Sequence, residues 1–162
     1  MVYIGLYLVA IVAANLSVAH WGPSATIVNA FLFIGLDLTS RDRLHDAWHG
    51  RGLWWKMALL VVAGSALSWI MNRAAARIAL ASLASFALAG LCDTIIYHFL
   101  RNKARILRVN GSNMVSALVD SIAFPTIAFG AFLPLIILGQ FAAKVVGGFL
   151  WSLVLWRGKK AE

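Results

Sequence analysis

Long apolar stretches are the feature of this sequence that most restricts its fold. Six of them, separated by short polar or glycine-containing breaks, make up nearly the whole chain. A helix needs about 20 apolar residues to cross the hydrocarbon core of a bilayer. We therefore expect six membrane-spanning helices, over residues 2–19, 24–44, 53–71, 74–100, 114–137 and 139–156.

The composition excludes most alternatives. Of the 162 residues, 62% are hydrophobic and only 12% are charged, whereas about 25% of residues are charged in a typical soluble domain. A small soluble domain has too little interior to bury so much apolar surface. A water-soluble enzyme and a nucleic-acid-binding domain are therefore excluded. We predict an all-α integral membrane protein, a compact bundle that forms one domain over residues 1–162.

The basic residues predict the orientation of this bundle. Eleven of the fourteen Lys and Arg residues lie near the break between the second and third stretches, after the fourth stretch or at the end of the chain. Arg73 and Arg77 fall on the opposite side, and Lys144 falls inside the sixth stretch. Because cytoplasmic loops carry the excess of basic residues, both termini are predicted in the cytoplasm. The net charge of +8 then faces anionic lipids of the inner (plasma) membrane rather than a nucleic acid.

Charged residues deep inside the predicted spans, at least five residues from either end, are the candidates for function. Each costs roughly 2.5–3.5 kcal/mol to insert, so such residues usually face the bundle interior or an aqueous cavity. Three of the six acidic residues in the chain are among them. The four residues are Asp37, Asp93, Asp120 and Lys144.

Their expected depths suggest one shared site for the acids. Counted at about 1.5 Å per residue, each acid lies about 10 Å below the cytoplasmic end of its predicted helix. Lys144 is expected beyond the midplane, in the outer half together with Asn15 and Asn29. We therefore expect the three carboxyl groups to converge and the lysine to lie apart from them.

Structural roles for these residues stay open as alternatives. Asp37 and Arg41 are four residues apart, which allows a local ion pair on one helix face. Lys144 can extend its ammonium group to the membrane surface. His45 and His49 have a metal-ligand spacing, but beside two aspartates at the expected membrane surface we interpret them as interfacial polar residues. No motif for a cofactor or an ATPase is present in the sequence.

Four stretches of the chain resemble one known family. They are FLFIGLDLTSRDRLH from Phe31 to His45, LCDTIIYHFLR from Leu91 to Arg101, NMVSALVDSIAFPTIAFG from Asn113 to Gly130, and FAAKVVGGFLW from Phe141 to Trp151. Each places a polar residue inside a predicted span. In this pattern the chain resembles the vitamin uptake transporter family, also called the queuosine precursor transporter family. It departs from that family in its minimal terminal extensions and its minimal loop between the third and fourth spans.

The resemblance implies import of 7-deazaguanine compounds, such as 7-cyano-7-deazaguanine, across the inner membrane. A guanine-like edge presents an N1–H and an amino group side by side, and one carboxylate such as Asp120 accepts hydrogen bonds from both. Aromatic side chains stack on flat rings, and Tyr97 and Phe124 each follow an acid by one turn. Asn15 or Asn29 then donates a hydrogen bond to an acceptor of the ring such as O6, and Lys144 pairs with an acid or contacts a carbonyl oxygen.

Our prediction is a six-helix transporter, not an enzyme, for a small planar nucleobase-like substrate. Carboxyl groups within the spans also suit proton coupling, because removal from water favours the uncharged form of a carboxyl. One alternative is the substrate-binding component of an energy-coupling vitamin transporter, whose ATPases are other chains. The other is a membrane scaffold or a membrane enzyme. Self-association into a homo-oligomer stays open.

Overall fold

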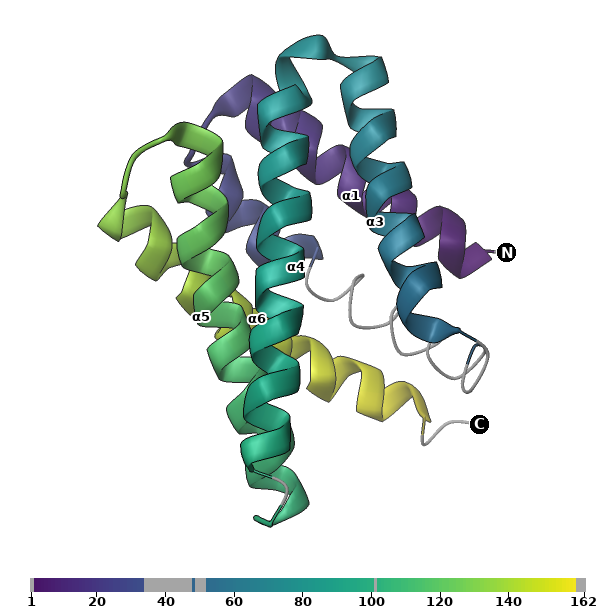
Figure 1. The fold of residues 1–162 in the computed structure, drawn as a ribbon, viewed down its shortest axis with the longest axis vertical. Helices are drawn as coiled ribbons and strands as arrows, with labels where there is room; N and C mark the ends of the chain where they lie inside the picture. Colours follow the sequence, from purple (N-terminus) through teal and green to yellow (C-terminus); the bar gives the residue numbers. More distant parts are fainter. Residues whose placement is uncertain (1, 34–47, 49–51, 101, 160–162) are drawn as a thin grey trace.

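A computed structural model describes residues 2–33, 48, 52–100 and 102–159 of the chain. Within these ranges the protein is helical and contains no strand. The helices are α1 (Val2–Trp21), α3 (Leu53–Met71), α4 (Ala76–Phe99), α5 (Arg105–Phe129) and α6 (Pro134–Lys159), with a short 3-10 helix η1 (Arg73–Ala75) before α4. Residues 25–33 are helical as well. Figure 1 shows their arrangement.

The outer surface of this bundle is apolar. Leu135 is 83% exposed and Phe99 is 77% exposed, and large hydrophobic side chains in such positions are typical of contact with lipid or with another protein. Three segments in the described part of the chain are long and apolar enough to cross a membrane, namely Tyr3–Trp21, Arg73–Asp93 and Gly111–Phe129. Ala58–Met71 and Pro134–Gly147 are shorter apolar helices. The described part of the chain therefore has the properties of a helical membrane protein.

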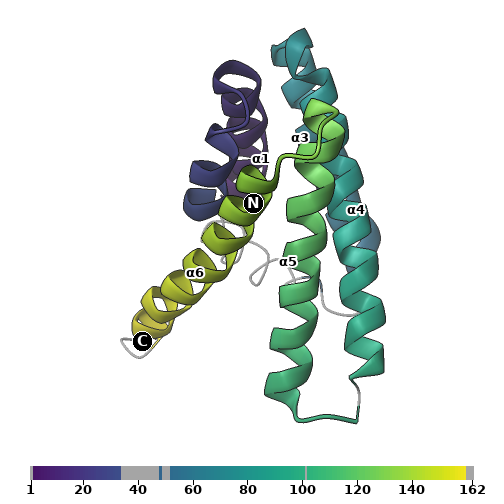
Figure 2. The ribbon, with the colours of Figure 1, turned by 90° about the vertical axis from the view of Figure 1, so that its left-hand side faces the viewer.

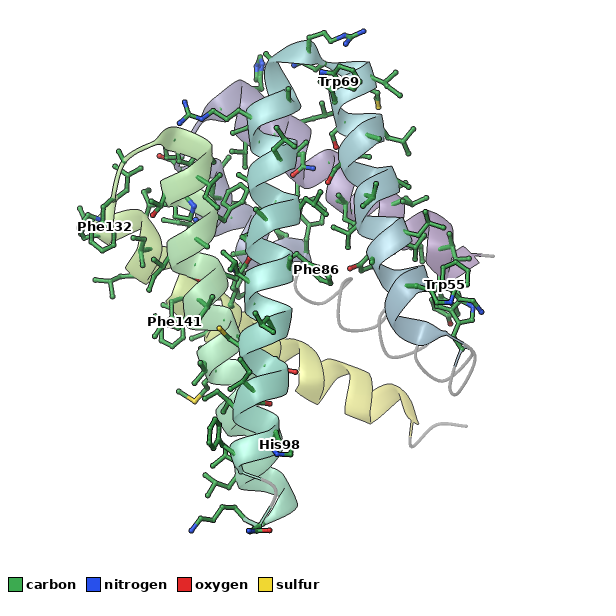
Figure 3. The ribbon with its side chains drawn as sticks, viewed as in Figure 1. Trp55, Trp69, Phe86, His98, Phe132 and Phe141 are labelled. Atoms are coloured by element: carbon green, nitrogen blue, oxygen red, sulfur yellow. The ribbon has the colours of Figure 1, made fainter. Side chains whose placement is uncertain are left out.

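Tryptophans flank α3 at both ends, as Figure 3 shows for Trp55 and Trp69. Each carries a cation over its ring: the Lys56 Nζ lies 5.7 Å from the Trp55 centroid, and the Arg73 guanidinium carbon lies 4.2 Å from the Trp69 centroid. Tryptophan is enriched at the level of lipid headgroups because its ring is apolar and its N–H is polar. The pairs therefore mark where the two ends of α3 meet a polar environment.

Helices α1 and α3 pack through an apolar cluster of Tyr7, Leu60 and Val61. Close approach of the two helices depends on Gly64, because a Cβ at this position would lie 2.7 Å from the Ile11 Cγ2. Small residues at helix interfaces in membranes allow such approach. The segment 53–71 was predicted as a helix with the bounds that α3 has, and α1 extends two residues beyond its predicted end.

Helices α4 and α5 form an antiparallel hairpin along their whole length (Figure 2). On α4, Ala81, Ser85 and Ala89 are buried at four-residue intervals. On α5, Ser121 and Ala128 are buried, and Pro125 is among the most completely buried side chains. These small side chains let the two backbones approach closely, which is how helices associate where lipid competes for apolar contact.

Helix α5 differs from its predicted bounds at both ends. It begins at Arg105 rather than 114, so much of the basic segment expected as a loop is helical; helical hydrogen bonding propagates at little cost once a helix exists. It ends at Phe129, because Gly130 adopts φ +68, a left-handed conformation that terminates helices. Pro134 then begins α6, where its missing N–H costs nothing. Gly130 and Pro134 therefore separate two helices instead of kinking one.

Helix α6 docks against residues 25–33 near its start. A Cβ on Gly139 would lie 2.5 Å from the Ile27 Cδ1, so the two backbones are close there. Figure 2 shows α6 diverging from α5 as it leaves the 130–133 turn. The inward side of α6 contains Ile137, Gln140, Lys144 and Gly147, at helical intervals of three and four. Gln140 and Lys144 thus face the protein rather than the surroundings.

Candidate functional site between α5 and α6

The centre of the candidate site is an ion pair between two membrane-type helices. The Lys144 ammonium on α6 contacts the Asp120 carboxylate on α5. The Lys144 side chain is 14% exposed and that of Asp120 is 29% exposed. Lys144 Nζ also donates to the Ser121 Oγ at 3.3 Å, and this hydroxyl donates in turn to the Ala117 carbonyl at 2.7 Å. Lys144 thus has two partners on α5, one of them charged.

The turn at residues 130–133 explains why these two residues meet. Asp120 lies nine residues before the end of α5, and Lys144 lies ten residues after the start of α6. Folding at the turn brings both to the same level, about 14–15 Å from it. The alternative that Lys144 pairs with an acid is therefore confirmed, and the expectation that it lies apart from the acids is wrong. It assumed that the fifth span continues to residue 137, which places Lys144 too near a helix end.

A second polar contact lies one turn away on α6. Gln140 Nε2 donates to the Thr26 Oγ1 at 2.9 Å, and both side chains are buried. The Thr26 hydroxyl donates to the Pro23 carbonyl at 2.5 Å. Residues 25–33, α6 and α5 are thereby joined by polar side chains. The sequence reasoning missed Gln140 and Thr26, although Gln140 stands four residues before Lys144 in an apolar run.

Asp93 does not join this ion pair. It continues the α4 row of Ala81, Ser85 and Ala89, and its Oδ1 is buried without a hydrogen-bond partner in the described structure. It lies six residues, about 9 Å, from the α4 end at the α4–α5 connection, whereas Asp120 lies fifteen residues, about 22 Å, from the α5 start at this connection. The expectation of equal depth is therefore wrong for these two acids, because α5 begins earlier than predicted.

Asn15 and Asn29 take part in contacts between helices. The Asn15 amide donates to the Ser68 Oγ at 3.1 Å, which joins α1 to α3. The Asn29 amide donates to the Ala14 carbonyl at 3.2 Å and to the Ser17 Oγ at 2.7 Å, which joins residues 25–33 to α1. These two bonds use both amide protons of Asn29. Its carbonyl oxygen is the atom left to contact a ligand.

The remaining predicted residues are dispersed. Phe124 packs against the cluster of Val18, Ile78, Ala81 and Ala128, where α1, α4 and α5 meet. Tyr97 lies in α4, and the position of its side chain is outside the described structure. Asp37, Arg41, His45 and His49 lie outside the described residues. Within the described part, no group of three or more His, Cys, Asp or Glu side chains is placed to hold a metal ion.

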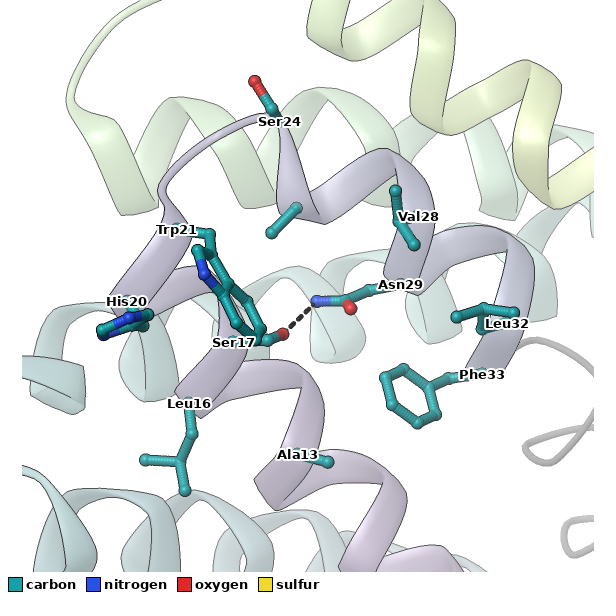
Figure 4. Close-up of a pocket in the computed structure, with 11 residues that line it drawn as sticks. Ala13, Leu16, Ser17, His20, Trp21, Ser24, Val28, Asn29, Leu32 and Phe33 are labelled. Atoms are coloured by element: carbon teal, nitrogen blue, oxygen red, sulfur yellow. Dashed lines mark hydrogen bonds between the residues drawn. The ribbon is translucent and has the colours of Figure 1, made fainter.

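An open pocket of about 710 Å³ lies elsewhere, between α1 and residues 25–33. Figure 4 shows that Leu16, Val28, Leu32 and Phe33 give it a mainly apolar lining, with the Asn29–Ser17 hydrogen bond across it. The ion pair is not part of this lining. The pocket therefore offers mainly apolar contact, with His20, Ser24 and the Asn29 amide among its polar groups, whereas the ion pair lies at the α5–α6 contact.

Apolar helices with an apolar exterior and an internal ion pair define the chain as an integral membrane protein. Charges held inside such a bundle typically mark a path for a substrate or an ion. The family described as "Putative vitamin uptake transporter" matches residues 1–156. The chain belongs to this family of transporters, as the resemblance indicated. The comparisons with curated proteins and with solved structures gave no match.

Proposed function

We propose that the chain imports a small planar compound of the 7-deazaguanine type, such as the queuosine precursor 7-cyano-7-deazaguanine. The observation that carries this proposal is the Lys144–Asp120 ion pair inside apolar helices. An ion pair at this place is costly to desolvate and contributes little net stability. It is better understood as part of a polar path through the bundle, and membership of an uptake family supports the same interpretation.

The chemistry of a guanine-like ring suits these side chains. Its N1–H and amino group need an acceptor such as a carboxylate, and its carbonyl oxygen needs a donor such as an ammonium group. Asp93 and Asp120 supply acceptors, and Lys144 supplies a donor. Asp37, Arg41, Tyr97 and Phe124 complete the proposed set of substrate-binding residues, together with Asn29 as the one taken from the alternatives Asn15 or Asn29.

The proposed topology has six spans in one domain, with both termini in the cytoplasm and the protein in the inner membrane. The two shorter apolar helices, Ala58–Met71 and Pro134–Gly147, extend the count beyond the three long candidates. Residues 25–33 begin the second span. Cysteine labelling from either side, starting from a Cys92→Ser background, tests the orientation. Labelling of a cysteine at position 3 from outside the cell would contradict it.

Transport is coupled to protons in this proposal. Ionisable side chains inside membrane spans often form proton relays in transporters, and Asp93 and Asp120 both lie in segments long and apolar enough to cross a membrane. Uptake into vesicles is expected to stop when a protonophore collapses the pH gradient. Unchanged uptake under this treatment would contradict proton coupling while leaving the import of the substrate intact.

Uptake by the purified chain in proteoliposomes tests the function itself. Accumulation of labelled 7-cyano-7-deazaguanine by the chain alone is the expected result. Binding of this compound without transport would instead indicate the substrate-binding component of an energy-coupling transporter. Thermal shift is measured with 7-cyano-7-deazaguanine, queuine, guanine and riboflavin. Stabilisation by riboflavin and by none of the other three would overturn the purine assignment.

A further inference from the structure

The two described intramembrane acids differ in their partners. Asp120 accepts from Lys144, and the pair is electrically neutral as a unit. Asp93 has no ion pair within the described structure, and its buried Oδ1 accepts no hydrogen bond. One other buried side-chain atom in the described residues lacks a partner, the Ser65 hydroxyl oxygen. Asp93 is therefore the carboxyl group among these residues whose hydrogen-bonding capacity is unused.

The position of Asp93 makes the missing hydrogen bond at its Oδ1 unfavourable. The α4 row that leads to it consists of small side chains, Ala81, Ser85 and Ala89, packed in the protein interior. A buried acceptor without a donor is unfavourable, and more so when it is charged. Asp93 as a whole is only half-buried, so part of the residue is accessible although its Oδ1 is not. A ligand that donates hydrogen bonds there removes an existing penalty.

Asp120 has less free hydrogen-bonding capacity for a ligand than Asp93 has. Its Oδ2 already accepts from Lys144, so a substrate must share or displace that donor. Removing one member of such a pair leaves an uncompensated charge, which is unfavourable in a bundle of low polarity. The pair also joins α5 to α6 at equal distances from their turn. These features are typical of a group that holds two helices together.

We infer that Asp93 is the carboxyl group that binds the N1–H and amino edge of the substrate, and that Asp120 instead neutralises Lys144 and positions α6 against α5. This inference rests on the proposed function, because it takes a guanine-like ring as the ligand. A carboxylate with both oxygens available accepts two adjacent N–H groups in a bidentate contact. Asp93 has an Oδ1 that accepts no hydrogen bond, and it has no ion pair within the described structure, whereas Asp120 can take up such a contact only if Lys144 moves.

Binding measurements on the purified full chain test the assignment. The probes are 7-cyano-7-deazaguanine and the analogue that lacks only its exocyclic amino group. We expect the wild-type chain to bind the complete compound about 10–100-fold more tightly, the discrimination that one bidentate contact provides. Asp93→Asn places an N–H where an acceptor is needed. It should reduce this ratio to near 1, and it should weaken binding of the analogue less than binding of the complete compound, because the analogue donates only its N1–H to Asp93.

The matched control removes the other carboxylate together with its partner. The double variant Asp120→Asn/Lys144→Gln should keep the ratio of the two affinities, even where its absolute affinity is lower. Asp93→Glu, which keeps a carboxylate, should retain part of the ratio and shows that Asp93→Asn acts through the lost acceptor. Each variant is compared with the wild type by size-exclusion chromatography, so that loss of folded protein is distinguished from loss of binding.

The outcomes separate this inference from the proposed function. A wild-type chain that discriminates between the probes, with Asp93→Asn keeping the full ratio, would overturn the inference and leave the substrate class standing. If the double variant Asp120→Asn/Lys144→Gln loses the ratio of the two affinities and Asp93→Asn keeps it, Asp120 is the residue that binds the N1–H and amino edge. A wild-type chain that binds neither probe would overturn the proposed function, and the inference with it.

Discussion

Two helix contacts in this protein use polar side chains in different ways. Between α1 and α3, a neutral hydrogen bond from Asn15 to Ser68 lies beside an apolar cluster, and Ser68 donates onward to the Gly64 carbonyl at 2.8 Å. Between α5 and α6, the contact is an ion pair, Lys144 with Asp120. Neutral amides and hydroxyls satisfy one another at modest cost, whereas charges are expensive to remove from water.

The comparison teaches which polar residues are candidates for function. The α1–α3 contact would serve packing equally well with other small or neutral residues, so its polar groups need no further role. The α5–α6 contact contributes little stability for its desolvation cost, and a packed apolar pair would hold the helices as well. Retaining charge there is understandable when charge is needed for a substrate or a proton.

The largest expected effect is on the ion pair. Lys144→Met leaves the Asp120 carboxylate without its counter-charge, and we expect a loss of about 3 kcal/mol in stability together with loss of transport. Urea or thermal unfolding in detergent measures the first effect, and uptake in vesicles measures the second. The double variant Lys144→Met/Asp120→Leu should recover much of the stability but not the transport. If the double variant is as unstable as the sum of the single variants, the two side chains are not coupled.

A smaller effect is expected from the backbone contact of α1 with α3. Gly64→Ala places a methyl group 2.7 Å from the Ile11 Cγ2 and 3.0 Å from its Cβ, which should cost about 1–3 kcal/mol of stability. Gly90→Ala is the matched control on α4, where a Cβ meets nothing within 4 Å. That substitution should be neutral or stabilise by up to about 1 kcal/mol. Equal melting temperatures for the two variants would contradict close packing at Gly64.

The smallest effect is expected from the neutral hydrogen bond. Asn15→Ala removes the donor to Ser68, and hydrogen bonds between membrane helices contribute about 0.6 kcal/mol on average. Unfolding of Asn15→Ala, Ser68→Ala and their double variant gives the coupling energy, and transport should persist in all three. Abolished uptake in the folded Asn15→Ala variant would assign Asn15 to the substrate path and remove the contrast drawn between the two contacts.

Much of the secondary structure was predictable because the length of an apolar run is a local property of the sequence. The bounds of α3 follow from the glycine-containing break before residue 53 and the Asn72 turn after it. The same reasoning failed at the end of α5. Apolar residues continue through Gly130 and Pro134 to residue 138, so hydropathy alone merges two helices. The left-handed backbone at Gly130 is what divides them.

The site was predictable only as a set of residue types. The cost of charge in an apolar span singled out Asp93, Asp120 and Lys144, but their mutual distances depend on where each helix begins and ends. An error of a few residues changes the expected depth by several ångströms. This error was enough to separate Lys144 from Asp120. It also gave Asp93 and Asp120 the same expected depth, although their depths differ.

The sequence by itself determined that this chain is a helical membrane protein with a few charges where lipid would reject them, because hydropathy and charge are sums over local residues. Only the tertiary structure decided that Lys144 meets Asp120 while a buried oxygen of Asp93 has no partner. Which charges pair depends on the 130–133 turn and on the close packing of α4 against α5. Both arise from contacts between residues that are distant in the chain.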